Sequence, residues 1–283
     1  MTGSISDILW NFISSYFVSM SDAERTSIIA IILSAFLFIV LERIFPYKKG
    51  QKIFREGFFD DLALYTIAQS YILGIIIFSF IIYYIDSTTG LSRLNLFKTI
   101  PIWIQLIFFT LIHDLYIYWM HRFQHRNKWL WRIHEAHHSP KEVDWLSGSR
   151  SHALEILINQ TVEFAPIILL GAPIEVIAFK GMISAVWGMY IHANINVHSG
   201  KLQLIINGPE MHRWHHSTGK GRNRNFSTKL AIWDWIFGTA YLPKDQKVDK
   251  YGLKAFFPQN YFKQFIFAFR AFKNKTRQSL NNR

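Results

Sequence analysis

The residues with the clearest chemical potential are the histidines, because most of them fall in short, repeated patterns. Residues 121–125 have the pattern His-x-x-x-His, which places both rings on one face of a helix. Residues 134–138 have the pattern His-x-x-His-His, and residues 212–216 repeat it. Together with His192, which ends an apolar segment, these patterns contain nine of the 12 histidines.

This pattern indicates metal binding, since neutral imidazole is a common ligand of zinc, copper, iron and nickel. A first-row ion takes about four to six ligands, so nine rings are too many for one ion. We therefore expect two ions, each held by four or five rings. An isolated histidine is usually an ordinary core or surface residue. A metal-free group of this size, however, would leave many buried rings in need of hydrogen-bond partners.

The elements that position these motifs are apolar segments long enough to cross a membrane. Half of the 283 residues are hydrophobic. Three segments approach the ~20 residues that a helix needs to span a bilayer, namely residues 27–45, 62–85 and 100–120. Two shorter segments, 153–170 and 173–191, are separated by a Gly-Ala-Pro turn signal. They predict a helical hairpin that crosses or dips into the bilayer.

The charges of the loops predict how these segments are oriented. The segment 47–58 carries four basic residues, and the regions 122–150 and 213–229 are also rich in Arg and Lys. The loop 86–99 carries only two basic residues against one acidic residue. We therefore expect an outward-facing N-terminus and cytoplasmic histidine motifs, because the hairpin returns His192 to the side that the third segment reaches.

The composition limits the kinds of partner that the chain can bind. Lys and Arg exceed Asp and Glu by 12, and this positive charge favours binding to an anionic surface. Because these basic residues lie beside apolar spans, we predict contact with the lipid bilayer and no nucleic-acid partner. The chain has no cysteine, which excludes disulfides and thiolate metal sites. Residues 8–20 lack the features of a cleavable signal peptide and predict an interfacial helix, as does the Phe-rich tail after Tyr261.

The histidine motifs are embedded in five longer blocks of sequence. These are Asp114-Leu-Tyr-Ile-Tyr-Trp-Met-His121-Arg-Phe-Gln-His125, Trp131-Arg-Ile-His134-Glu-Ala-His137-His138-Ser139, His192-Ala-Asn194, His212-Arg-Trp-His215-His216-Ser217 and Trp233-Asp-Trp-Ile-Phe-Gly-Thr239. In order and spacing, over residues 105–240, they resemble the fatty acid hydroxylase/sterol desaturase superfamily. Within it, the His192 block is most similar to alkylglycerol monooxygenase-like and bacterial members.

The resemblance implies an all-α fold, a polytopic membrane helical bundle with a histidine-rich cytosolic cap. We expect a single integral membrane domain over residues 1–283, with the catalytic core at 105–240. The implied activity is a non-haem di-iron oxygenase that uses O2 and an external electron donor to hydroxylate or desaturate a lipid substrate (a sterol, a fatty acyl chain or an ether lipid). The implied metal ligands are His121, His125, His134, His137, His138, His192, His212, His215 and His216.

Three further residues are predicted to support the ligands. Asp114 lies two helical turns before His121, and an ionisable residue within a span is a functional candidate. In the block from Arg150 to Glu155, we expect His152 and Glu155 to orient ligand rings. A simple buried hydrogen-bonded pair is the alternative for these two residues.

The remaining histidines, His113 and His198, are predicted to be ordinary residues. His113 is expected to point away from the face that carries His121. His198 lies six residues beyond His192, which breaks helical register.

Several alternatives bear on the chemistry. The sequence contains no His-Pro-Gly-Gly haem-binding segment, so we expect a separate donor such as a reductase, ferredoxin, cytochrome or pterin. Zinc can replace iron in a purified sample, because its affinity for such ligands is higher than that of ferrous iron. The alternative function is a histidine-rich membrane metal transporter. Such a protein would carry histidines or acids along a path inside the spans, whereas nearly all of the histidines here are predicted to lie at one face. A zinc hydrolase needs only three protein ligands, which leaves most of the nine histidines unexplained.

Overall fold

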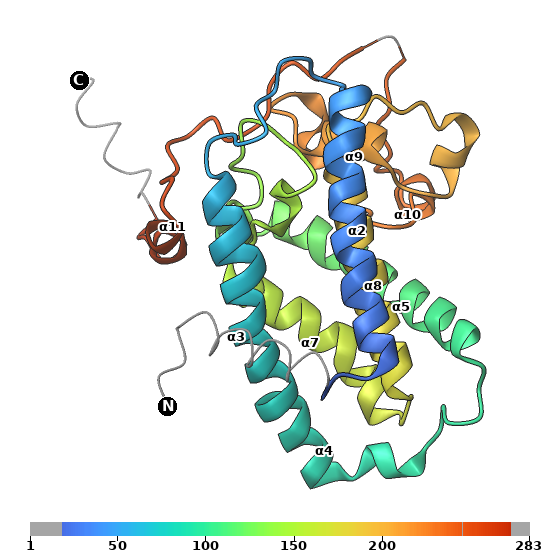
Figure 1. Cartoon of the computed structure of the whole chain (residues 1–283). Helices are drawn as coiled ribbons and strands as arrows, with labels where there is room; N and C mark the ends of the chain where they lie inside the picture. The colour runs from blue at the N-terminus through green and yellow to red at the C-terminus, as the bar shows by residue number, and fades with distance from the viewer. Residues whose placement is uncertain (1–18, 245, 273–283) are drawn as a thin grey trace, which may run out of the picture.

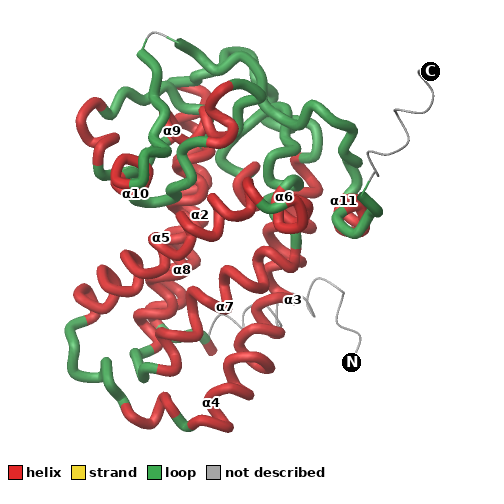
Figure 2. The backbone as a smooth tube through the Cα atoms, turned by 180° about the vertical axis from the view of Figure 1, so that it is seen from behind, coloured by secondary structure: helices red, strands yellow, loops and turns green. Residues whose placement is uncertain are grey.

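The computed structural model describes residues 19–244 and 246–272, which form helices and loops without a strand (Figure 2). The helices are α2 (Asp22–Ile44), α3 (Ser70–Gly74), α4 (Tyr83–Thr89), α5 (Ile102–Arg126), α6 (Lys128–His134), α7 (Ala153–Leu169), α8 (Ile174–His192), α9 (Pro209–His215), α10 (Ile232–Ile236) and α11 (Tyr261–Phe267). Two π-helical stretches, Asp60–Gln69 and Ile75–Ile82, join α3 and α4 into one continuous helix over residues 60–89. The all-α fold predicted from the sequence is confirmed for the described ranges.

Local sequence signals explain where the long helices begin and end. Ser21 and Glu24 form a reciprocal capping box at the start of α2. The side chain of His152 caps α7 by accepting a hydrogen bond from the Leu154 amide. Gly171, with φ of +73°, makes the turn between α7 and α8. The predicted hairpin is therefore present.

The long helices pack into one bundle (Figure 1). Helix α2 lies along α8, and α8 also contacts α5 and α7. The helix at 60–89 packs on α7. The apolar core of this bundle contains Leu73, Ile77, Ile82, Phe109, Phe164, Ile167 and Val176. This core fixes the directions of the helices that carry histidines at their ends.

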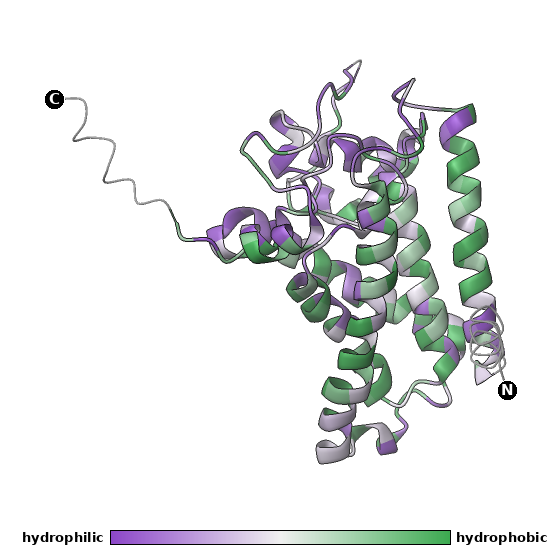
Figure 3. Cartoon of the chain, turned by 60° about the vertical axis from the view of Figure 1, so that its left-hand side comes forward, coloured by the Kyte–Doolittle hydropathy of each residue, from purple (hydrophilic) through white to green (hydrophobic). Residues whose placement is uncertain are grey.

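The helices of the bundle consist mostly of hydrophobic residues (Figure 3), and many of these residues are exposed. Four helices are long and apolar enough to cross a membrane, namely Asp22–Ile44, Asp60–Thr89, Ile102–Arg126 and Ile174–His192. On α2 alone, the exposed residues include Ile32, Leu33, Phe36, Leu37 and Ile44. Exposed apolar surface of this extent indicates contact with lipid, so the chain is an integral membrane protein. Helix α7, with 17 residues, is shorter than the four.

A cap of loops and short helices covers one end of the bundle, and it contains α6, α9 and α10 (Figure 2). Helix α5 continues to Arg126, six residues beyond the predicted end of its span, and so enters this cap. Helix α11 exposes apolar side chains at Phe262, Phe265 and Ile266, whereas Gln264 is buried. The interfacial helix predicted for residues 8–20 lies outside the described residues except at its last two positions.

Candidate metal centre

The nine predicted ligands come from four parts of the chain that meet where the cap covers the bundle. His121 and His125 lie near the end of α5, and His192 is the last residue of α8. The other six lie in or directly after α6 and α9, namely His134, His137, His138, His212, His215 and His216. Their ring nitrogens form two groups, each with all ligand atoms within 4.8 Å of one another. The five-histidine cluster is His121, His125, His134, His138 and His215, and the four-histidine cluster is His137, His192, His212 and His216.

In the five-histidine cluster, several rings direct the same atom at one point. The Nε2 atom of His138 lies 3.1 Å from Nε2 of His125, 3.1 Å from that of His134 and 3.0 Å from that of His215. A ring nitrogen carries at most one hydrogen, so these three contacts cannot all be hydrogen bonds. With metal–nitrogen bonds of about 2.1 Å, two ligands at right angles are about 3 Å apart. The separations therefore suit nitrogens that share an ion.

The four-histidine cluster has the same arrangement around His192. The Nε2 atom of His192 lies 3.3 Å from Nε2 of His137, 3.2 Å from that of His216 and 3.0 Å from that of His212. The Nε2 atoms of His212 and His216 are 3.1 Å apart. These contacts again exceed what one hydrogen per nitrogen can satisfy. The two clusters are adjacent, because the ring centroids of His138 and His216 are 4.7 Å apart.

The outer nitrogens of the rings explain why the inner ones are free to bind metal. Nδ1 of His121 donates to the carbonyl oxygen of Phe226 (2.7 Å), and Nδ1 of His192 donates to that of Gly188 (2.7 Å). His215 and His137 make equivalent bonds to the carbonyls of Arg224 (2.8 Å) and Arg150 (3.2 Å). A carbonyl only accepts, so each Nδ1 carries the hydrogen and Nε2 presents a lone pair.

Burial also favours the neutral, ligating form of the rings. It is the main cause that lowers the pKa well below its usual value of 6.5 for His137, His138, His212, His215 and His216. Neighbouring rings lower the pKa of each further, because two protonated imidazoles repel each other. In addition, the Nε2 atom of His121 is buried without a hydrogen-bond partner. The residues present therefore fit two nitrogen-ligated metal ions.

Comparisons with known proteins agree with this geometry. The family model "Fatty acid hydroxylase" matches residues 106–239, which include all nine histidines. The "Ornithine lipid hydroxylase OlsE" of Rhizobium tropici is 32% identical over 256 residues, which cover 84% of this chain and 76% of that protein. The chain belongs to the fatty acid hydroxylase family. The resemblance noted from the five sequence blocks is thereby confirmed.

Other relatives in this family match a shorter region. The "Alkylglycerol monooxygenase" of Danio rerio is 34% identical over 145 residues, covering 50% of this chain and 31% of that protein. The "Methylsterol monooxygenase 2-2" of Arabidopsis thaliana is 30% identical over 146 residues, covering 48% of this chain and 52% of that protein. No solved structure matches the chain.

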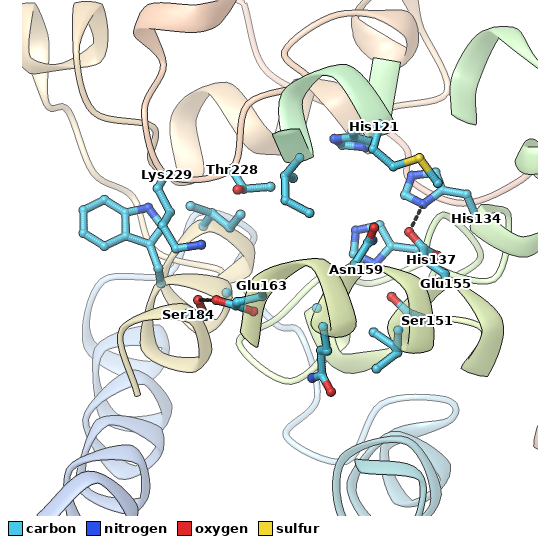
Figure 4. Close-up of a pocket in the computed structure, with 18 of the residues that line it drawn as sticks. His121, His134, His137, Ser151, Glu155, Asn159, Glu163, Ser184, Thr228 and Lys229 are labelled. Carbon is cyan, nitrogen blue, oxygen red and sulfur yellow. Dashed lines mark hydrogen bonds and ion pairs between the residues drawn. The ribbon is translucent and has the colours of Figure 1, made fainter. Parts of the chain in front are cut away.

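In this member of the family, a cavity of about 230 Å³ lies against both histidine clusters (Figure 4). His121 and His134 line it from one cluster, and His137, His192 and His212 line it from the other. A second cavity of about 350 Å³ lies between the helix at 60–89, α7 and α8. The two cavities share lining residues, including Ile156, Gln160 and Gly188, and are therefore neighbours. Together they reach from the metal centre into the apolar bundle.

Of the predicted supporting residues, Glu155 lies against a ligand ring. Its Oε1 accepts a hydrogen bond of 2.7 Å from Nδ1 of His134, drawn in Figure 4, and one of 2.9 Å from Nε2 of Gln124. A carboxylate in this position fixes the ring orientation and raises the basicity of the inner nitrogen. His152 is not paired with Glu155. Instead it caps α7 and stacks on Phe265, with ring centroids 4.6 Å apart.

Asp114 is buried, but its hydrogen bonds go to a loop and to none of the nine rings. Its carboxylate accepts hydrogen bonds from Thr228 Oγ1 and from the backbone amides of Lys229 and Leu230, at 2.8–2.9 Å. The indole of Trp233 is a fourth donor, at 3.0 Å. Asp114 therefore holds the loop after α9 against α5, which differs from the prediction that it orients a ligand ring.

The two histidines predicted to be ordinary lie outside both clusters. The side chain of His198 is 82% exposed, and its Nδ1 lies 3.5 Å from Glu210. His113 is buried and lines the same cavity as His121. The prediction that it points away from the face of His121 is wrong, because eight residues along an α-helix bring a side chain back to within about 80°.

A buried ion network that no sequence motif indicated holds the loop before α7. The Asp61 carboxylate accepts from Nη2 of Arg55 at 2.7 Å and from Nε of Arg150 at 2.6 Å. Arg55 also binds Asp144, at 2.8 and 2.9 Å. Since the carbonyl of Arg150 accepts from His137, this network sets the position of a ligand ring. The charges were visible in the sequence, but their pairing joins residues some 90 positions apart.

Gly148, in the same loop, allows His192 to approach. A Cβ atom at this position would lie 2.5 Å from Nδ1 of His192, which is closer than real Cβ contacts. The glycine is thus required by a close approach rather than by its backbone angles.

Proposed function

We propose that this chain is a membrane-bound di-iron oxygenase that hydroxylates or desaturates a lipid with O2. The single observation that carries the proposal is that nine imidazole rings each direct one nitrogen into one of two adjacent clusters beside a cavity. The relatives named as a lipid hydroxylase and as alkylglycerol and methylsterol monooxygenases support a lipid as the substrate. The proposed catalytic core is residues 105–240 of a single domain.

The proposed ligands are the nine histidines of the two clusters, with Glu155 holding the ring of His134. When bound, a pair of iron ions supplies the O2-dependent oxidation of an unactivated C–H bond, which side chains alone cannot perform. The protein's own task is to orient the lipid and to keep water out. Ile117, Ile156 and Trp187 supply apolar walls of the cavity for this purpose.

We further propose that a lipid chain enters from the bilayer through the second cavity, between the helix at 60–89, α7 and α8. Its lining includes apolar side chains such as Phe164 and Met189, which suit an acyl chain. The charge distribution of the loops supports a cytoplasmic histidine cap. Electrons are then supplied by a separate cytoplasmic donor.

The proposal is tested by supplying purified, iron-loaded protein in detergent with bacterial lipid extract, a chemical or enzymatic reductant and 18O2. Mass spectrometry should show a lipid that gains one 18O atom or loses two hydrogens. The change should be absent with His137→Ala and retained with His198→Ala, since His198 is exposed and outside the clusters. Folded, iron-loaded wild-type protein that alters no lipid across extracts of several compositions would refute the proposal.

A further inference from the structure

The end of the cavity far from the nine proposed ligands contains a largely buried cation. Lys229 lies in the loop between α9 and α10 and lines the cavity. Only 7% of this residue is exposed. Figure 4 shows Lys229 and Thr228 at one end of the cavity and His134 and His137 at the other. Within residues 19–244 and 246–272, no acceptor or carboxylate lies within bonding distance of its ammonium group, which is open to the cavity that the residue lines. An ammonium group largely removed from bulk water and without a protein acceptor is stabilised when a ligand supplies one.

The position of this lysine is fixed by its own backbone. The Lys229 amide donates to Asp114 at 2.9 Å, and its carbonyl accepts from the Asn207 amide at 2.9 Å. The neighbouring Thr228 and Leu230 are also bonded to Asp114. These bonds hold the residue against α5, so its side chain is kept in the cavity.

The nearby acidic groups are already engaged. The Glu163 carboxylate contacts the Lys180 ammonium and the Ser184 hydroxyl, and lies 3.5 Å from Nδ1 of His113. The oxygens of Asp114 accept four hydrogen bonds, none of them from a lysine ammonium. Both carboxylates reduce the local positive potential, but neither is hydrogen-bonded to the three N–H groups of Lys229 in the structure.

We propose that Lys229 binds an acidic group, a carboxylate or a phosphate, on the lipid substrate. This inference rests on the proposed function, because it assigns the chemical class of the molecule that enters the same cavity. An acidic group at Lys229 supplies the missing acceptor for the buried ammonium. The rest of the substrate then extends along the cavity toward His121 and His137. Lys229 is thus a positioning residue, which selects lipids by charge and sets which carbon lies beside the metal centre.

Binding without turnover tests this inference. The full chain is purified in detergent, and the retention of tritiated palmitic acid is compared with that of tritiated methyl palmitate. A parallel pair, tritiated phosphatidic acid and diacylglycerol, distinguishes a phosphate from a carboxylate. Since a hydrogen bond to a charged group is worth about 10- to 100-fold in affinity, at least one acidic lipid should bind that much more tightly than its neutral partner.

Three variants identify the residue responsible. Lys229→Met should abolish the preference for the acidic lipid, and Lys229→Arg should retain most of it. Lys254→Met, which removes an exposed lysine of the cap, should leave it unchanged. If wild-type protein binds the acid and its neutral partner equally, or if Lys229→Met keeps the preference, the inference is wrong. Should Lys229→Met fail to fold, the wild-type comparison and Lys229→Arg still decide it.

The metal content of the same samples separates this inference from the proposed function. Lys229→Met should retain the wild-type metal content, because Lys229 touches neither cluster. Protein that holds no metal yet selects acidic lipids through Lys229 would contradict the oxygenase and leave the inference standing. Protein that holds metal and oxidises a lipid without any charge preference would do the reverse.

Discussion

For most of the ligand rings, the acceptor bound to the outer nitrogen determines that the inner nitrogen presents its lone pair. Backbone carbonyls hold His121, His137, His192 and His215, and these acceptors cannot be removed by a side-chain substitution. Glu155 is different, because its carboxylate holds His134 from a side chain. It is therefore a position, like Asn223 beside Nδ1 of His125, where the support of a ligand can be tested without changing the ligand itself.

The substitution Glu155→Gln should weaken metal binding while leaving all nine rings in place. The amide is neutral and lowers the basicity of the His134 ring, and outer-sphere changes of this kind typically reduce metal affinity by about 10- to 100-fold. Competition with a chelator of known affinity measures the change. The matched control is Glu56→Gln, an exposed carboxylate, which should have wild-type affinity. Equal affinities for the two variants would show that Glu155 has no role at the centre.

The buried rings also predict how the metal-free protein responds to acid. Burial lowers the pKa of His137, His138, His212, His215 and His216 well below 6.5. Below about pH 6.5 the unfolded chain therefore binds protons that the folded chain does not, and the free energy of unfolding decreases as pH falls. The midpoint of thermal unfolding, measured in detergent between pH 8 and pH 5 with a chelator present, should fall. A midpoint that is constant or rises toward pH 5 would contradict the burial of neutral rings.

Single residues differ in how far the sequence could predict them. The motif spacing identified eight of the nine histidines that converge, because positions three and four apart share a helical face regardless of the tertiary fold. His192 was predicted from its place at the end of an apolar segment. The partner of Asp114 could not be predicted in this way. It depends on where the loop at 228–233 lies, and that loop is joined to α5 only in the folded protein.

At the scale of elements, the histidines are held by helix ends and by the loop that precedes α7. Helices α5 and α8 reach the centre from the bundle, whereas α6 and α9 are short and belong to the cap. Hydropathy predicted the long helices well, because a membrane span needs a long apolar run. It did not predict that α5 extends to Arg126, since the last turn of this helix is polar and lies beyond the apolar segment.

The ion network of the loop before α7 should be important for stability. Asp61 is fully buried between Arg55 and Arg150, so Asp61→Asn leaves two buried cations short of a partner. Such a change costs about 3–5 kcal/mol, measured as a decrease in the free energy of unfolding in detergent. For comparison, Glu56→Gln breaks an exposed pair with Lys141 and should cost about 0–1 kcal/mol. A loss for Asp61→Asn as small as that of the control would show that the network does not hold the loop.

At the scale of the whole molecule, the helices place both clusters at one end of the bundle. The bundle brings His192 to the same side as His121, as the hairpin prediction required, and this arrangement of helices is compatible with either side of the membrane. The orientation is therefore a prediction from charge. The absence of cysteine from the chain makes it directly testable.

Single cysteines at the two ends of the bundle should report the orientation. Lys254→Cys lies in the cap, and Lys98→Cys lies in the loop between α4 and α5; both positions are exposed. In intact cells, a membrane-impermeant maleimide should label Lys98→Cys but not Lys254→Cys, which should react only after lysis. The opposite labelling pattern would place the histidine cap outside the cytoplasm.

The number of metal ions bound per chain tests the central claim most directly. Elemental analysis of protein purified with excess iron should find about two ions per chain. His125→Ala, in the five-histidine cluster, and His216→Ala, in the four-histidine cluster, should each reduce the content toward one ion, while His198→Ala should keep both. Folded wild-type protein that binds no metal, or cluster variants that lose none, would contradict two metal sites built from the nine histidines.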